Sequence, residues 1–186
     1  MSDIKVLGIC GSLRKGSFNM MALRVAQSLA PPGMKIDIAD ITAFSLYNED
    51  VRAQGFPPAV QTFRDQIAAA DALLFVTPEY NYSIPGVLKN AIDWASRPPN
   101  QPFDGKPVAI MGASGGVLGT ARAQYHLRQA CVFLNMFPVN KPEVMIPQAQ
   151  NRFDAQGNLT DETAKGLIKQ LLESLQAWTL RLKPKA

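Results

Sequence analysis

Short apolar runs alternate with longer amphipathic stretches along the chain. Residues 4–10 read I-K-V-L-G-I-C and residues 72–76 read A-L-L-F-V, a composition typical of strands buried in a parallel sheet. Between such runs, apolar residues recur at steps of three and four, which is the period of a helix with one buried face. This alternation predicts a parallel sheet that is covered by helices on both faces.

The pattern is regular enough to place each element. We expect five strands, at residues 4–10, 34–39, 72–76, 108–111 and about 139–146. We expect five helices, at residues 18–29, 58–70, 88–97, 120–134 and 160–178. A chain of 186 residues without repeats or linkers is predicted to form a single domain over residues 1–186.

The stretch G-S-L-R-K-G-S-F-N, residues 11–19, joins the first strand to the first helix. Such a turn directs free backbone N–H groups and the positive end of the helix dipole toward one small volume, which favours an anion. The stretch lacks both the dinucleotide fingerprint and the P-loop pattern. Its hydroxyl, amide and guanidinium groups suit a terminal phosphate, and the simpler interpretation is a turn with a serine cap.

A second polar loop, T-P-E-Y-N-Y-S-I-P-G at residues 77–86, follows the third strand. In a sheet of order 2-1-3-4-5, the flavodoxin-like order, ligands bind where the strand order reverses, between strands one and three. Both loops are therefore expected to face one pocket. A glycine-rich loop at residues 112–119 would let a flat ligand approach closely. The three loops together predict a site for a phosphorylated planar ring, namely flavin mononucleotide (FMN).

Composition narrows the alternatives. The net charge of +4 comes from scattered Lys and Arg, so nucleic-acid binding is not indicated. The chain has one histidine, His126, and two distant cysteines, which argues against a metal site and a disulfide framework. His126 and Cys131 would point about 140° apart on one helix, so a Cys–His pair is not expected. Without a signal peptide or a membrane-length apolar run, a soluble cytoplasmic protein is expected.

The two long motifs, G-S-L-R-K-G-S-F-N and T-P-E-Y-N-Y-S-I-P-G-V-L-K-N-A-I-D-W, resemble the NAD(P)H-dependent FMN reductase family, particularly its quinone and chromate reductase branch. The resemblance implies a flavodoxin-like three-layer sandwich. It implies that the FMN phosphate is surrounded by Ser12, Arg14, Ser17, Phe18 and Asn19. It implies that the isoalloxazine ring is lined by Pro78, Glu79, Tyr80 and Asn81, with Ser114 and Gly115 on its third side.

The resemblance also implies a homodimer or homotetramer, because open flavin faces in this family are typically completed by a second subunit. The candidate subunit surfaces in this sequence are residues 44–47, Trp94, Arg122, Tyr125 and Glu143. For Glu79 and the tyrosines of the second loop, two interpretations remain open. Glu79 either lines the ring or is a solvated carboxylate, and the tyrosines either stack on substrate or pack at a subunit boundary.

The function expected from these observations is hydride transfer by an FMN-dependent enzyme, from NAD(P)H to a small-molecule acceptor with ping-pong kinetics. The acceptor could be a quinone, an azo compound, a metal oxyanion or free flavin. Hydride transfer needs no protein nucleophile, so no catalytic side chain is assigned, and the reaction is placed beside Tyr80 and Asn81. The alternative is a flavodoxin-like carrier that exchanges single electrons with a protein partner, although such carriers are usually acidic. Arg14 slightly favours NADPH over NADH.

Overall fold

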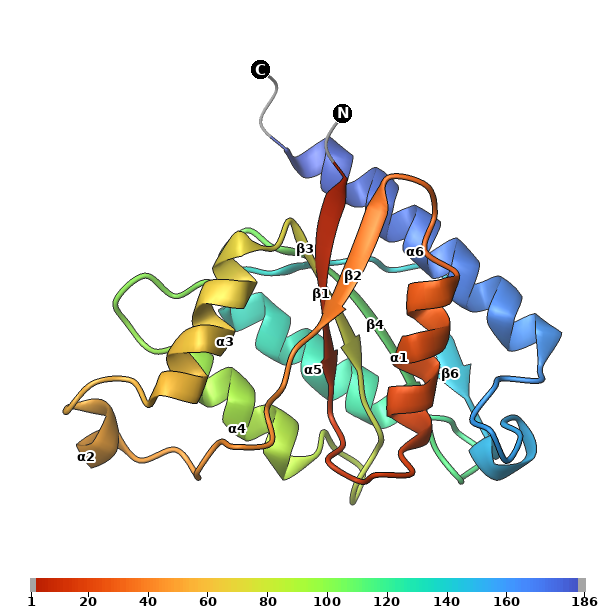
Figure 1. Cartoon of the computed structure of the whole chain (residues 1–186), viewed down its shortest axis with the longest axis horizontal. Helices are drawn as coiled ribbons and strands as arrows, with labels where there is room; N and C mark the ends of the chain where they lie inside the picture. Colours follow the sequence, from red (N-terminus) through yellow and green to blue (C-terminus); the bar gives the residue numbers. More distant parts are fainter. Residues whose placement is uncertain (1–2, 184–186) are drawn as a thin grey trace.

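A computed structural model describes residues 3–183 of the chain. Figure 1 shows a twisted sheet with helices on both faces, and every strand pairing in it is parallel. The strand order is β2-β1-β3-β4-β5, with β6 also paired to β4, so the predicted flavodoxin-like order is confirmed. The strands are β1 (Ile4–Cys10), β2 (Met34–Ile38), β3 (Ala72–Val76), β4 (Pro107–Ala113), β5 (Phe137–Pro138) and β6 (Val144–Ile146).

The fifth position of the sheet holds two short strands, where the sequence analysis placed one strand at residues 139–146. β5 pairs with the first residues of β4, and β6 pairs with the last ones. Pro138 is the last residue of β5, and Pro142 lies between β5 and β6. Proline has no N–H group to donate to a neighbouring strand. The chain therefore leaves the sheet between β5 and β6 and returns to it beside the end of β4.

The helices form the two outer layers. α1 and α6 cover one face of the sheet, and α3, α4 and α5 cover the other (Figure 1). The helices are α1 (Phe18–Ser28), α2 (Glu49–Arg52), α3 (Pro58–Ala69), α4 (Gly86–Ala95), α5 (Ala121–Phe133) and α6 (Glu162–Leu182), with a 3₁₀ turn, η1 (Ala149–Asn151). α6 begins at Glu162, and Asp161 is its N-cap, accepting a hydrogen bond from the N–H of Ala164.

Each central strand sends alternate side chains into the two cores, as a strand covered on both faces must. In β3, Leu74 and Val76 pack with α1 and α6, whereas Leu73 and Phe75 pack with α3, α4 and α5. All five residues of β3 are buried. This rigid double core fixes the carboxyl ends of the strands, where the candidate site lies.

Trp94 was expected at a subunit surface, and this prediction is wrong. The side chain is 0% exposed and its indole N–H donates to the carbonyl of Ser45 at 2.8 Å. Tyr47 packs edge-on against it, with ring centroids 5.0 Å apart. Trp94 therefore anchors residues 44–47 onto α4 within the chain. Among residues 3–183, no helix combines the length and the apolar character needed to cross a membrane.

Candidate functional site

Three loops meet at the carboxyl edge of the sheet, the lower edge in Figure 1. They are the first loop (residues 11–17), the second loop (residues 77–85) and the third loop (residues 114–120). The strands that feed them are neighbours in register, since Cys10 lies opposite Val76, and Val76 lies opposite Met111. The loops predicted to share one pocket are thus brought together by the strand order.

Glycine allows the loops to approach one another at two positions. A Cβ on Gly11 would lie 2.8 Å from the hydroxyl of Thr77. A Cβ on Gly112 would lie 2.2 Å from both the carbonyl oxygen of Thr77 and the hydroxyl of Thr120. Any larger residue at Gly112 would therefore collide with backbone as well as with a side chain, so the floor of the site requires glycine there.

The first loop presents backbone donors, as the sequence predicted for an anion site. Ser17 is the N-cap of α1, and its hydroxyl oxygen accepts from the N–H of Met20 at 3.3 Å. Within residues 3–183, no hydrogen-bond acceptor is found for the N–H groups of Ser12, Leu13, Lys15, Gly16, Phe18 and Asn19. These unpaired donors stand at the positive end of the α1 dipole, which is where an anion is stabilised.

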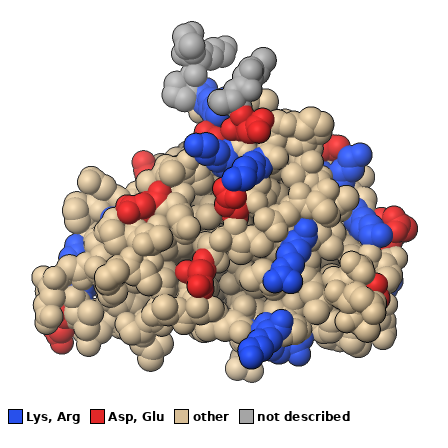
Figure 2. Space-filling view, viewed as in Figure 1, with Lys and Arg blue, Asp and Glu red and all other residues tan. Residues whose placement is uncertain are grey.

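Two basic residues of the first loop add positive charge. Arg14 folds back over the loop, because its guanidinium donates to the carbonyl of Gly16 and lies 5.4 Å from the ring centroid of Phe18. Lys15 is exposed. On the face seen in Figure 2, Lys and Arg side chains lie over α1 and at the lower edge, beside the first loop. The backbone donors and the charges therefore favour the same kind of ligand.

Phe18 and Asn19 hold α1 in place beneath the first loop. Phe18 stacks on Phe153, with ring centroids 5.5 Å apart. Asn19 is 3% exposed, and its side-chain amide exchanges two hydrogen bonds with the backbone of Ala113, at 2.8 and 2.9 Å. The amide of Asn19 thus joins α1 to β4, and its contribution to the loop surface is its backbone N–H.

The second loop ends in a tight turn. Tyr80 and Ser83 exchange two backbone hydrogen bonds of 3.0 Å, and Asn81 and Tyr82 between them have φ values of 48° and 66°. Two consecutive residues with positive φ in a closed four-residue turn correspond to type I′. The rings of Tyr80 and Tyr82 are exposed at its tip. In the described part of the chain, the N–H of Glu79 has no acceptor, so it is available to a ligand.

The side chain of Glu79 is buried, and the interpretation of Glu79 as a solvated loop carboxylate is wrong. Its side chain is 6% exposed, and one carboxylate oxygen accepts from the N–H groups of Arg122 and Ala123 at 3.0 and 3.1 Å. The other oxygen forms an ion pair with the guanidinium of Arg122. The structure therefore places this carboxylate on the first turn of α5, and leaves the backbone of the loop for a ligand.

Arg122 and His126 belong to the site region, although the sequence analysis named Arg122 only as a candidate subunit contact and assigned His126 no role. The guanidinium of Arg122 lies 3.5 Å from the ring centroid of Tyr82, and Nδ1 of His126 is 3.0 Å from the hydroxyl of Ser83. The sequence held one signal for Arg122, its place in the first turn of α5. A cation at that end of a helix is unfavourable next to the dipole, so an anionic partner such as Glu79 was to be expected.

The third loop is attached to the segment that follows β6. Ser114 donates its N–H to the carbonyl of Ile146 at 3.0 Å and accepts from the N–H of Ala149 at 2.9 Å. Gly116 accepts from the N–H of Gln148 at 3.0 Å. Ser114 is half-buried and Gly115 is exposed, so both predicted residues lie at the rim of the site.

Exposed apolar side chains surround the three loops. Of the twelve large apolar or aromatic residues exposed in the described chain, five lie on these loops: Leu13, Tyr80, Tyr82, Val117 and Leu118. Exposed apolar side chains beside unpaired backbone donors are typical of a binding site for a ligand that is partly apolar. The arrangement fits FMN, whose phosphate would use the donors of the first loop and whose ring would lie among the apolar side chains.

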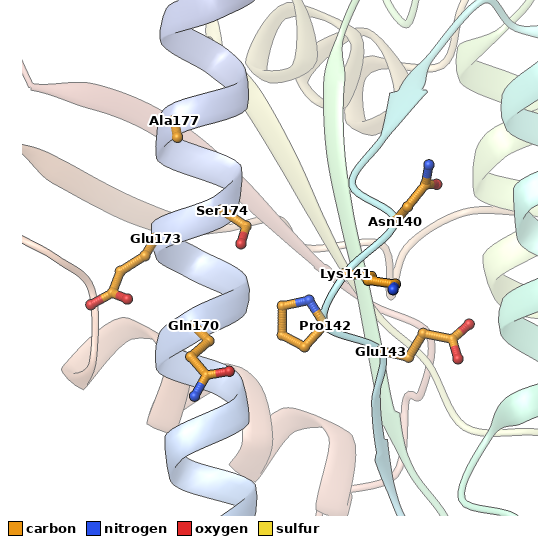
Figure 3. A pocket seen from close by; sticks show the side chains of 8 residues that line it. All are labelled: Asn140, Lys141, Pro142, Glu143, Gln170, Glu173, Ser174 and Ala177. Carbon is orange, nitrogen blue, oxygen red and sulfur yellow. The ribbon is translucent and has the colours of Figure 1, made fainter.

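The largest cavity described in the structure lies elsewhere, in an open groove of about 990 Å³ between α6 and residues 140–143. Figure 3 shows Gln170, Glu173 and Ser174 of α6 on one side of this groove and the segment from Asn140 to Glu143 on the other. None of the predicted site residues lines it. The residues singled out by the sequence lie on the three loops, which therefore stay the candidate site.

Comparison with known proteins gives consistent matches. Residues 4–151 match the family model described as NADPH-dependent FMN reductase. The chain is 69% identical over 181 residues to an NAD(P)H-dependent FMN reductase of Pseudomonas aeruginosa, covering 97% of this chain and 98% of the relative. It is 50% identical over 188 residues to an NADPH:quinone oxidoreductase of Arabidopsis thaliana, covering 98% of this chain and 95% of that protein.

A solved structure agrees with these matches. The flavoenzyme NAD(P)H:(acceptor) oxidoreductase FerB from Paracoccus denitrificans superposes with a TM-score of 0.86 at 36% identity, covering 96% of this chain and 98% of that chain. The predicted enzyme class, an NAD(P)H-dependent oxidoreductase of the FMN and quinone reductase type, is confirmed, with FMN as the cofactor and NAD(P)H as the co-substrate of the family. The chain belongs to the NADPH-dependent FMN reductase family.

Proposed function

We propose that this protein, acting as one domain over residues 1–186, binds FMN at the three loops and uses NAD(P)H to reduce a quinone-like small molecule. The observation that supports the proposal best is the joint presence of six unpaired N–H groups on and beside the first loop and five exposed apolar side chains around the same edge. A ligand with a compact anion at one end and a flat ring at the other matches both features.

At the phosphate end, the backbone donors of the first loop and of the first turn of α1 would hold the phosphate oxygens. Ser12 and Ser17 would add hydroxyl donors, and Arg14 would add a permanent charge above the loop. Phe18 and Asn19 would contribute their backbone N–H groups, since their side chains pack against Phe153 and Ala113. This end anchors the cofactor and takes no part in the reaction.

At the ring end, Pro78, Glu79, Tyr80 and Asn81 would line the isoalloxazine ring through the backbone of the second loop, and Ser114 and Gly115 would close the third side. The polar pyrimidine edge of the ring needs hydrogen-bond donors, and the unpaired N–H of Glu79 is one. The tight turn fixes the loop before any ligand arrives, which lowers the entropic cost of binding.

When bound, FMN would supply the redox chemistry, taking a hydride from NAD(P)H and giving it to the acceptor. The protein would contribute orientation, because the ring site is open at the surface and both substrates would occupy the same place in turn, near Tyr80 and Asn81. Such alternation predicts ping-pong kinetics. A homodimer or homotetramer would complete the open face, and light scattering at micromolar concentration tests this assembly. The cytoplasmic location stays a prediction.

The decisive experiment combines a spectrum with an anaerobic titration. The purified protein should show the visible absorption of bound flavin, and NADPH alone should bleach it. Addition of a benzoquinone should restore it, and initial rates should give parallel double-reciprocal lines. Flavin that stays oxidised with both NADPH and NADH, in the absence of any partner reductase, would instead favour the single-electron carrier. Separate assays with an azo dye, chromate and free FMN would rank the acceptors.

A further inference from the structure

We propose that Glu79 and Arg122 are positioning residues, which lock the second loop onto α5 and thereby set the ring end of the flavin site. The inference rests on the proposed function, because it assigns the ring to the second loop. It concerns a contact between two distant segments of the chain, Glu79 at the end of β3 and the first turn of α5.

α5 has no local side-chain cap. Thr120 is its N-cap residue but makes no capping hydrogen bond, since its hydroxyl accepts from the amide of Gln124 at 2.9 Å. The N–H groups of Arg122 and Ala123, which a cap normally satisfies, donate to the Glu79 carboxylate instead. Glu79 therefore serves as the cap of α5 from a loop that lies 43 residues earlier in the chain.

Arg122 extends this attachment to the tip of the loop. Its guanidinium pairs with Glu79 on one side and lies 3.5 Å from the ring centroid of Tyr82 on the other. His126, one helical turn further along α5, contacts the hydroxyl of Ser83 at 3.0 Å. We call this set of five residues the loop clamp: Glu79, Tyr82, Ser83, Arg122 and His126.

The turn needs support from outside because its backbone is strained. Asn81 and Tyr82 both have positive φ, a conformation that costs free energy in a residue with a side chain and persists only where surrounding contacts impose it. The loop clamp supplies such contacts on both sides of the turn. Without them the backbone N–H of Glu79 would lose its fixed direction toward the ring.

It follows that different parts of the protein bind the phosphate and the ring of the cofactor. The phosphate end depends on the first loop and α1. Within residues 3–183, the hydrogen bonds of that loop join it to itself, to α1 and to the ends of β1 and β3, and none joins it to α5. A change in the loop clamp should therefore weaken the binding of the ring without changing the binding of the phosphate. Riboflavin, which has the same ring but no phosphate, distinguishes the two contributions.

The test compares Glu79→Gln with wild-type protein by flavin fluorescence titration, using FMN and riboflavin. Gln has nearly the same shape but no charge, so the pair with Arg122 is lost. We expect the dissociation constants of both flavins to rise by the same factor, about tenfold or more, as for the loss of a charged hydrogen bond. Glu162→Gln makes the same change at an exposed ion pair with Lys165 on α6, and it is the matched control, with no change expected. Tyr82→Ala should weaken the binding of both flavins by a smaller, equal factor.

An unchanged affinity for both flavins in Glu79→Gln, or a loss for FMN alone, would overturn the proposal. If Glu79→Gln does not fold, Tyr82→Ala decides the matter, because Tyr82 is 68% exposed and contributes little to the core. If wild-type protein binds neither flavin, the proposed function fails, and hydrogen exchange still tests the clamp. The amides of Tyr80, Ser83 and Ala123, each of which donates a hydrogen bond in the intact turn or cap, should then exchange faster in Glu79→Gln or Tyr82→Ala. Equal rates would overturn the clamp.

Discussion

The first and second loops of the site differ in what fixes their shape. Within the turn from Ser12 to Met20, the hydrogen bonds that shape the first loop join residues two or three positions apart, such as the N–H of Arg14 with Ser12 and the N–H of Met20 with Ser17. Only Gly11, at the start of this loop, donates to a distant residue in the described chain, the carbonyl of Val76 at the end of β3. The second loop depends on partners about 43 residues away, in particular Arg122 and His126 on α5. One loop is shaped by its own sequence and the other by the tertiary fold.

This difference matches the two tasks of the site. A phosphate needs a dense set of donors at a helix N-terminus, which a short local turn provides by itself. A flat ring must be held at a defined angle so that a substrate can stack on it, which requires a loop fixed against a rigid element. Substitutions that attack the two loops separately should therefore have different effects on cofactor binding and on stability.

The largest loss of stability should come from Gly112→Ala, because Gly112 packs directly against Thr77, the first residue of the second loop. The added Cβ would lie 2.2 Å from the carbonyl oxygen of Thr77 and from the Thr120 hydroxyl. Relief would require moving backbone at the end of β3, so the free energy of unfolding should fall by about 3 kcal/mol or more in urea titrations. Gly116→Ala is the control, because its nearest neighbour would be 3.7 Å away, and an equal loss there would contradict the steric explanation.

The next effect tests a distant attachment of the phosphate side, the two hydrogen bonds between Asn19 on α1 and Ala113 on β4. Asn19→Ala removes both hydrogen bonds to the backbone of Ala113 and leaves a buried N–H and a buried carbonyl unpaired. The free energy of unfolding should fall by about 2–4 kcal/mol, measured in urea. Asn48→Ala removes an exposed cap of α2 and should cost about 1 kcal/mol or less. A small stability loss in Asn19→Ala, together with weaker FMN binding, would show that the Asn19 side chain binds the phosphate and does not mainly support the fold.

The same contrast explains what the sequence could predict. The strands, the helices and the donors of residues 11–19 follow from local patterns, namely continuous apolar runs, helical periodicity and a strand-to-helix turn. The strand order, and with it the place of the three loops, came from the flavodoxin-like arrangement and is the order found in the structure. The destinations of Asn19 and Glu79 did not follow, since their partners lie 94 and 43 residues away. The direction of these two side chains depends on packing between distant segments, which the local pattern does not contain.

Two other differences had signals in the sequence. Trp94 lies three residues after Ala91, at the edge of the apolar face of α4, so helical periodicity was compatible with burial. Pro138 ends β5 and Pro142 precedes β6, and the two prolines indicated that the strand expected at residues 139–146 is interrupted. In both cases a local signal agreed with the structure, and the prediction did not use it.

A smaller effect is expected from Ser17→Ala, which tests whether the first loop binds only the phosphate. Ser17→Ala removes a hydroxyl from the N-cap of α1 and should lower the stability of the protein by about 1 kcal/mol. FMN affinity should fall about tenfold, the scale of one hydrogen bond to a charged group, whereas riboflavin affinity should stay the same. Fluorescence titration measures both. An equal loss for the two flavins would show that the first loop also holds the ring, and would remove the assignment of this loop to the phosphate.

The smallest effect is a difference in labelling rate between the two buried thiols, Cys10 next to the first loop and Cys131 in α5, the helix that holds the second loop. Cys10 ends β1 directly before the first loop and donates its thiol to the carbonyl of Ser12 at 3.6 Å, while Cys131 is 0% exposed in α5. Burial raises the pKa of both thiols, and that of Cys131 to about 12, so reaction with a disulfide reagent at neutral pH requires opening of the structure. Because a local turn opens more readily than a packed helix, Cys10 should be labelled first in native protein, as followed by peptide mass spectrometry. FMN should slow the labelling of Cys10 by stabilising the first loop, whereas simultaneous labelling of both cysteines would mean that the two sides open only together.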